Sequence, residues 1–168
     1  SFEERALIQR IASNRNVPNV VVGIGSEVPS RVNARRFRQR RNFFRRFVIY
    51  VGRIDENKGC TELFAYFQRY SKTGQLDLVL IGNPVMAIPS HPRIHHLGFV
   101  SDEEKFDAMA AADLLIMPSY FESLSMVTLE AWTLGLPTLV NGHCDVLRGQ
   151  VIRANAGLYY TNYQEFLE

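Results

Sequence analysis

From residue 47 to the end of the chain, short apolar runs alternate with longer segments whose apolar residues recur at helical spacing. Such runs, flanked by turn residues, are typical of buried strands, and the segments between them of amphipathic helices. This alternation requires right-handed crossovers, which make the strands parallel and cover both faces of the sheet with helices. The sequence therefore predicts an α/β fold with a doubly wound parallel sheet. The predicted strands are residues 47–51, 76–81, 93–98, 113–117, 137–140 and 158–160, and the predicted helices are residues 60–70, 101–112, one that ends at 134 and one that begins at 163.

The composition indicates a globular protein. With 168 residues, a net charge of +2 and 46% hydrophobic residues, the chain has enough apolar side chains for one core. Its two cysteines, Cys60 and Cys144, are too few for a disulfide framework and favour a reducing compartment. The apolar runs are far shorter than the roughly 20 residues of a membrane-spanning helix. We therefore expect a cytoplasmic protein.

No metal site is expected. Cysteine and histidine do not occur at zinc-ligand spacing. His91, His95 and His96 lie in a predicted loop and short strand without acidic partners at ligand spacing, which favours a surface position for them.

Residues 1–46 are predicted to be a lead-in to the α/β domain of residues 47–168. Ser1 and Glu4 fit a capping box at the start of a helix of about three turns. Val20–Gly25 is an apolar run typical of a buried strand. This helix and strand are interpreted either as the end of a preceding domain that the chain does not contain or as an edge element of the same domain.

The most basic stretch is Arg31–Arg46, in which eight arginines are interleaved with aromatic residues. No acid occurs between Glu27 and Asp55. Three interpretations compete: a solvated linker, a surface for peripheral contact with anionic lipid at the inner membrane face, and a nucleic-acid patch. The last lacks a base-stacking or recognition motif, so we expect no nucleic-acid partner.

A glycine ends or directly follows each of the first three predicted strands, and the loop after the first strand also carries two cations. Because the carboxyl ends of parallel strands meet at one edge of a sheet, where ligands gather, these residues predict a common site. The ordinary alternative is that the glycines serve the turns and that the arginine pairs with a neighbouring acid. The residues concerned are Arg53, Lys58, Gly82, Gly98, Phe99 and Val100.

A fourth loop, Pro118–Ser125, leads from a strand into a helix, with Glu122 in the turn and Glu130 eight positions later. The free N–H groups and the dipole at a helix start favour an anion, and carboxylates accept hydrogen bonds from hydroxyl groups. Phosphate and hydroxyl groups together indicate a nucleotide sugar. The alternative is that the serines only cap the helix and that the glutamates form a solvated face.

Three of these features together resemble a known family: the loop Gly52–Gly59, the segment Gly98–Ser101, and the pair Glu122 and Glu130 across seven intervening residues. They are similar to the C-terminal, donor-binding half of retaining glycosyltransferases of family 4, which have GT-B architecture. The resemblance covers about residues 47–168. It implies a Rossmann-like domain that binds a nucleotide sugar.

The resemblance also implies a role for each matching residue. Arg53 and Lys58 face the donor diphosphate. Glu122 faces the transferred sugar and, with the two cations, makes up the catalytic groups, while Glu130 faces the ribose hydroxyls. The family often has glycine at two of the turn positions, so phosphate binding there falls to backbone N–H groups. The other predicted donor-binding residues are Ser123, Leu124, Ser125 and Gly82, with Phe99 and Val100 near the base.

The implied activity is retaining hexosyl transfer from a UDP-, GDP- or ADP-linked sugar, without a metal or other cofactor, in glycan, glycolipid or polysaccharide synthesis. A GT-B enzyme needs a second, acceptor-side domain, which is missing here. We therefore expect the chain alone to bind nucleotide and to be poorly active. Two alternatives stay open: a sugar-nucleotide epimerase of similar fold, and a non-catalytic basic module that binds anionic lipid or polymer.

Overall fold

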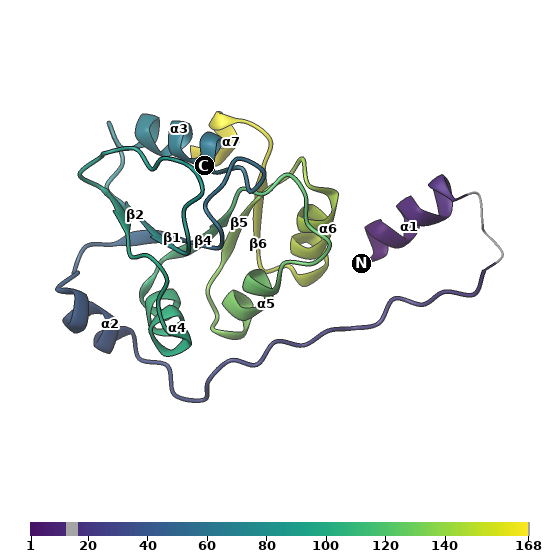
Figure 1. Ribbon diagram of the computed structural model, residues 1–168, viewed down its shortest axis with the longest axis horizontal. Coiled ribbons are helices and arrows are strands. Elements are labelled where there is room, and N and C mark those ends of the chain that lie inside the picture. The colour runs from purple at the N-terminus through teal and green to yellow at the C-terminus, as the bar shows by residue number, and fades with distance from the viewer. Residues whose placement is uncertain (13–16, 168) are drawn as a thin grey trace.

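The computed structural model describes residues 1–12 and 17–167. Its strands are β1 (Phe47–Val51), β2 (Asp77–Ile81), β3 (Ile94–His96), β4 (Leu114–Met117), β5 (Thr138–Asn141) and β6 (Gly157–Tyr160). All six lie in one parallel sheet in the order β3-β2-β1-β4-β5-β6, which confirms the predicted doubly wound α/β fold (Figure 1).

Helices cover both faces of this sheet. One face carries α2 (Ala34–Arg41), α4 (Asp102–Ala111) and α5 (Met126–Thr133). The other carries α3 (Cys60–Tyr70), α6 (Asp145–Ala154) and α7 (Tyr163–Leu167). Successive side chains of a strand point to opposite faces, so Ile49 joins the core on the α4 side and Tyr50 the core on the α3 side. β1 and β2 are buried along their whole length because both of their faces are covered.

Two helices of the structure are absent from the sequence prediction: α2, which lies in the basic run described below, and α6. No element is expected between residues 140 and 158, where the structure has α6. Gly149 lies in its interior and lowers its helix propensity. Val146, Leu147 and Val151 are nevertheless buried in the α3-side core, so tertiary packing rather than local propensity stabilises this helix.

The order of the strands reverses at β1. After β1 the chain adds β2 and then β3 on one side, and it returns to place β4 on the other side of β1. The loops that follow β1 and β4 therefore begin side by side at the carboxyl edge of the sheet. In open α/β sheets this switch point is where ligands bind.

At the N-terminus, α1 (Phe2–Ile11) forms as predicted, with Ser1 and Glu4 in a capping box. It lies beside α6, where Arg153 makes an ion pair with Glu3 (Figure 1). Burial by itself would raise the pKa of Glu3, but the hydrogen bond from Arg153, a backbone hydrogen bond and the nearby positive charges together outweigh it and lower the pKa. None of the residues of α1 is buried, so charge rather than a shared apolar core attaches it to the domain.

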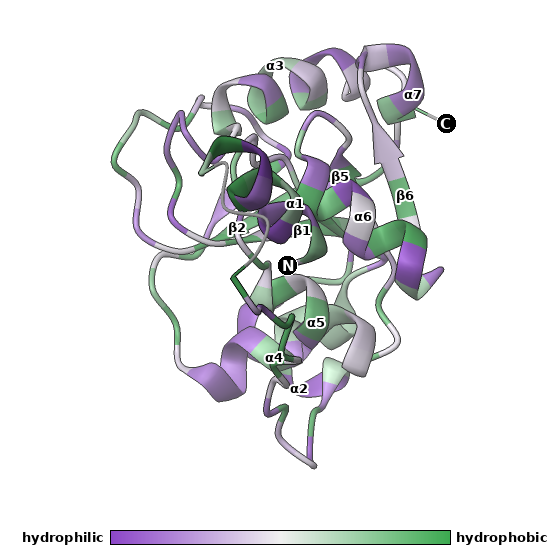
Figure 2. Ribbon diagram, turned by 90° about the vertical axis from the view of Figure 1, so that its right-hand side faces the viewer, coloured by the Kyte–Doolittle hydropathy of each residue, from purple (hydrophilic) through white to green (hydrophobic). Residues whose placement is uncertain are grey.

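The predicted strand at Val20–Gly25 is wrong. This segment is irregular, and Val20, Val22 and Ile24 are all well exposed. Figure 2, seen from the α1 side, shows hydrophobic residues along the chain between α1 and α2. An apolar run becomes a strand only where a neighbour satisfies its backbone hydrogen bonds, and no strand lies beside it among residues 1–12 and 17–167.

The basic run Arg31–Arg46 folds onto the domain and contains α2. Phe37 is 1% exposed in the α4-side core, and the Arg36 guanidinium binds the buried carboxylate of Asp107. The run is therefore a packed part of the fold, and its interpretation as a solvated linker is wrong. Lipid contact and a domain boundary at residue 46 stay predictions. Further ion pairs of the run are Arg36–Glu103, Arg40–Glu103, Arg41–Glu104, Arg45–Asp77 and Arg46–Asp113.

None of the helices within the described residues combines the length and the hydrophobicity that crossing a bilayer requires.

Candidate functional site

The loops after β1 and β4 meet at the switch point, and a glycine permits this contact. Gly59 has a φ of 72°, and a Cβ atom there would lie 2.0 Å from the carbonyl oxygen of Pro118. Glycine alone tolerates both the left-handed backbone and this close approach. The start of α3 is thereby held against the turn that follows β4.

This contact brings together two of the predicted catalytic residues. Lys58 Nζ lies 2.7 Å from Glu122 Oε1. The Lys58 side chain is 30% exposed and the Glu122 side chain 11% exposed, so the pair is partly shielded from water. The two loops therefore converge as expected, whereas the roles of their side chains toward a donor stay a prediction.

Asp55 organises the loop after β1. Its carboxylate accepts hydrogen bonds from Arg53 Nε and, at 2.8 Å, from the backbone N–H of Lys58. Burial by itself would raise the pKa of Asp55, but these hydrogen bonds outweigh it and hold the pKa below its ordinary value. Arg53 thus pairs with a neighbouring acid, as the ordinary alternative predicts. Its side chain is still 59% exposed and accessible to a ligand.

The turn into α5 is capped by Ser125, which is 2% exposed. Its hydroxyl oxygen accepts hydrogen bonds from the Thr128 N–H at 3.3 Å and from Thr128 Oγ1 at 2.7 Å. Its own N–H donates to Gln150 Oε1 at 3.3 Å. Both polar groups of Ser125 are thus used within the fold. Leu124 is half-buried and Ser123 exposed, so Ser123 is the most accessible of the three predicted turn residues.

Glu130 lies on α5 beside Lys105 of α4. Lys105 Nζ is 3.2 Å from Glu130 Oε1 and 3.2 Å from Oε2. The two side chains are 17% and 13% exposed, respectively. Sequence reasoning missed Lys105, because it is 25 positions from Glu130 on another helix and no spacing rule links the two.

Gly82 and Gly98 hold two further loops at the same edge of the sheet. A Cβ atom at Gly82 would lie 2.0 Å from the carbonyl oxygen of Gly52, and the Gly82 N–H donates to Gly98 O at 2.9 Å. The close backbone approach predicted for Gly82 is therefore to the loop after β1. Phe99 is 82% exposed, whereas Val100 packs against the α4-side core. Base binding at these two residues stays a prediction.

A cavity of about 1020 Å³ opens beside Glu122, between α1, the turn after β4 and the start of α6. Tyr120 fixes part of its wall, because its hydroxyl donates to Glu62 Oε2 at 2.8 Å and its ring stacks on His143. Glu122 thus pairs with Lys58 and also lines a cavity that is large enough for a hexose.

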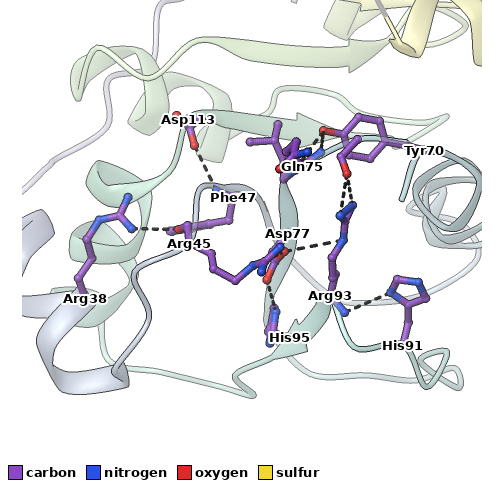
Figure 3. Close-up of polar contacts among 12 residues, drawn as sticks. Arg38, Arg45, Phe47, Tyr70, Gln75, Asp77, His91, Arg93, His95 and Asp113 are labelled. Carbon is purple, nitrogen blue, oxygen red and sulfur yellow. Dashed lines mark hydrogen bonds and ion pairs between the residues drawn. The ribbon is translucent and has the colours of Figure 1, made fainter. Parts of the chain in front are cut away.

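A second polar cluster surrounds Asp77 at the opposite, amino edge of the sheet (Figure 3). Asp77 is 1% exposed, and its carboxylate lies 3.0 Å from Arg45 Nε, 3.9 Å from Arg93 Nε and 2.8 Å from His95 Nε2. His95, for which the sequence offers no acidic partner at ligand spacing, pairs with Asp77 from the adjacent strand, 18 positions away. Across residues 1–12 and 17–167, no group of three His, Cys, Asp or Glu side chains is arranged to hold a metal ion.

Comparison with known proteins identifies relatives of most of the chain. The family model "Glycosyl transferases group 1" matches residues 45–166. The mannosylfructose-phosphate synthase of Agrobacterium fabrum is 28% identical in an alignment of length 129 that covers 66% of this chain and 28% of that protein.

Solved structures show the same fold. Sucrose-phosphate synthase from Thermosynechococcus elongatus has a TM-score of 0.79 at 20% identity and covers 98% of this chain and 45% of its own. Anabaena HepE in complex with UDP-glucose has a TM-score of 0.64 at 21% identity and covers 80% of this chain and 40% of its own. These likenesses confirm the Rossmann-like fold. The chain spans less than half the length of each of these relatives.

Proposed function

This chain belongs to the glycosyl transferases group 1 family, and from this premise we propose that it is the donor-binding domain of a retaining hexosyltransferase. The observation that carries the proposal is the contact between Lys58 and Glu122 at the β1–β4 switch point. A cation and a carboxylate on adjoining loops suit a donor whose diphosphate and sugar lie next to each other.

Lys58 and Arg53 supply positive charge for the leaving diphosphate. As the bond between the anomeric carbon and the diphosphate oxygen breaks, negative charge grows on that oxygen and the sugar becomes oxocarbenium-like. Both cations extend from the loop after β1 and retain solvent access, at 30% and 59% exposure. One preorganised group of this kind stabilises a transition state by about 3 kcal/mol. This supports a reaction that needs no divalent metal.

Glu122 is proposed to orient the transferred sugar rather than to attack it. Its carboxylate is already neutralised by Lys58, which makes it a weak nucleophile. We therefore propose a front-face mechanism in which the acceptor oxygen bonds to the anomeric carbon on the side from which the diphosphate leaves. The departing diphosphate takes the acceptor proton. NMR of the product should show the donor's anomeric configuration, and an inverted centre would rule this mechanism out.

The rest of the donor is proposed to lie along the same edge of the sheet. Glu130 accepts hydrogen bonds from the ribose hydroxyls, and the backbone at Phe99 and Val100 pairs with the base. Anabaena HepE was solved with UDP and with UDP-glucose, which supports a UDP-linked sugar as the first donor to test. The acceptor groups are proposed to come from a second domain, because the relatives are more than twice as long as this chain.

Calorimetric titration of the chain with UDP, GDP, ADP and UDP-glucose tests the proposal. We expect at least one nucleoside diphosphate to bind and its affinity to fall in Lys58→Ala. Lys72→Ala, which alters an exposed lysine between α3 and β2, should leave the affinity unchanged. Failure of every nucleotide to bind would contradict donor binding. Recovery of an epimerised donor in place of free nucleotide would favour a sugar-nucleotide epimerase instead.

A further inference from the structure

Lys105 and Glu130 form an ion pair between neighbouring helices, α4 and α5, on the same face of the sheet. The ammonium lies 3.2 Å from each carboxylate oxygen and makes a hydrogen bond to Oε1. Both side chains are more than four-fifths buried, with exposures of 17% and 13%. The pair is therefore shielded from water far better than an ordinary surface ion pair, which contributes only about 0–1 kcal/mol.

The surroundings of Lys105 direct its charge toward Glu130. Its ammonium lies 4.1 Å from the centre of the Phe106 ring. The other carboxylate near it is Asp102, at 3.6 Å, whose side chain is 87% exposed. A well-hydrated carboxylate competes weakly for the ammonium. Glu130 is thus the partner that holds Lys105 in place.

The Glu130 carboxylate retains acceptor capacity beyond this pair. Its Oε2 atom is buried and lacks a hydrogen-bond donor within the described part of the chain, although Lys105 is near enough to attract it. An ionised carboxylate has about four lone-pair sites, and buried acceptors are normally satisfied. Glu130 is therefore held in one orientation by a single cation, while one of its carboxylate oxygens has no hydrogen-bond donor among the described residues.

We propose that Lys105 is a positioning residue that fixes the Glu130 carboxylate for the ribose hydroxyls of the donor nucleotide. The proposal rests on the donor-binding function proposed above. It assigns to Lys105 the discrimination between a ribonucleotide and its 2′-deoxy counterpart. Without the ammonium, the buried Glu130 loses its compensating charge and either turns toward water or takes up a proton. In both cases it becomes a poorer acceptor for a ribose hydroxyl.

Calorimetry on the full chain tests this role with the nucleoside diphosphate that the wild type binds best and with its 2′-deoxy form. The readout is ribose discrimination, the ratio of the two dissociation constants. A hydrogen bond to a charged group makes this ratio about tenfold or more in the wild type. In Lys105→Met, which keeps the apolar stem, the ratio should fall to the value of Glu130→Gln. Lys105→Arg, which keeps the charge, should restore part of it, and Lys72→Met should leave it unchanged.

The double variant separates positioning from general packing. In the Glu130→Gln background, Lys105→Met should cause no further change in the ratio, because the residue acts through the carboxylate. A lysine that only packs α4 against α5 would weaken both nucleotides equally and leave the ratio intact, which would overturn the proposal. If Lys105→Met does not fold, Lys105→Gln replaces it with the same expected loss.

The two proposals fail in distinguishable ways. If Lys105→Met keeps the ribose discrimination of the wild type while Lys58→Ala binds the nucleoside diphosphate more weakly, the role of Lys105 is overturned. The proposed donor site is then still supported. A wild-type chain that binds none of the nucleotides overturns the donor site and the role of Lys105 together.

Discussion

Lys58 Nζ and Glu122 Oε1 lie 2.7 Å apart, although 64 positions separate the two residues in the chain. Lys58 follows β1 and Glu122 follows β4, so the pair joins the two loops at the point where the strand order reverses. A diphosphate bound there would share the ammonium with Glu122. In the proposed site, the Lys58 ammonium therefore lies between the Glu122 carboxylate and the donor diphosphate and interacts with both.

Lys58→Ala should weaken the binding of a nucleoside diphosphate by roughly tenfold to a hundredfold, because a charged hydrogen bond to phosphate is lost. Binding of the corresponding nucleoside, which has no phosphate, should change little. Calorimetry with UDP and uridine checks both, and Lys72→Ala is the matched control. Equal losses for UDP and uridine would show that the substitution disturbs the fold of the site rather than a phosphate contact.

Gly59→Ala should separate the two loops that bring this ion pair together. The new Cβ atom would lie 2.0 Å from the Pro118 carbonyl oxygen, at a φ of 72° that disfavours alanine. We expect a loss of about 1–3 kcal/mol in the free energy of unfolding and weaker nucleotide binding. Urea denaturation and calorimetry measure the two effects. Gly23→Ala is the control, since a Cβ atom there meets nothing within 4 Å, and an equal effect of both substitutions would refute the argument.

The sheet could be predicted from the sequence because its inner strands, β2, β1, β4 and β5, are almost wholly buried and appear as continuous apolar runs. The same rule fails at Val20–Gly25, which has the pattern of a strand but no neighbour to pair with among the described residues. It also fails for α6. Gly149 lowers the helix propensity of this segment, and the helix is stabilised by burial of Val146 and Leu147. Local pattern therefore predicts an element only where tertiary contacts agree with it.

The candidate site could be predicted in outline because the carboxyl ends of parallel strands converge, which brings Lys58 to Glu122. The ion-pair partners on the neighbouring helices could not be predicted from the sequence. Lys105 reaches Glu130 across 25 positions, and Asp107 reaches Arg36 across 71, because helices on one face pack side by side. Such pairs follow from the packing of helices, which no linear spacing in the sequence encodes.

Asp107→Asn should make the protein less stable at neutral pH but not in acid. Burial by itself would raise the pKa of Asp107, but the hydrogen bonds from Arg36 and from the Asn33 N–H outweigh it and lower the pKa. A lowered pKa means that the native state binds fewer protons than the unfolded state. The stabilisation is therefore complete above the unfolded pKa of about 3.9 and is lost as the pH falls through the native pKa.

Urea denaturation of the wild type and of Asp107→Asn between pH 7 and pH 3 measures this difference. The gap in the free energy of unfolding should be about 1–3 kcal/mol at pH 7, because the variant weakens a charged hydrogen bond while Arg36, which is 32% exposed, keeps its ion pair with Glu103. It should narrow as the pH falls below 4. A gap that stays constant over the whole range would show that Asp107 acts through packing and not through its charge.

Asp77→Asn should lower stability without changing nucleotide affinity, because Asp77 begins β2 at the edge of the sheet opposite the site. Its carboxylate is 1% exposed and lies 3.0 Å from Arg45 Nε and 2.8 Å from His95 Nε2. An amide presents one acceptor oxygen to these donors instead of two, which should cost about 1–3 kcal/mol in the free energy of unfolding. Glu27→Gln, which removes an exposed charge, is the control and should have little effect. If fully folded Asp77→Asn binds nucleotide more weakly than the wild type, the two edges of the sheet are coupled. That result would contradict the prediction that Asp77 affects stability alone.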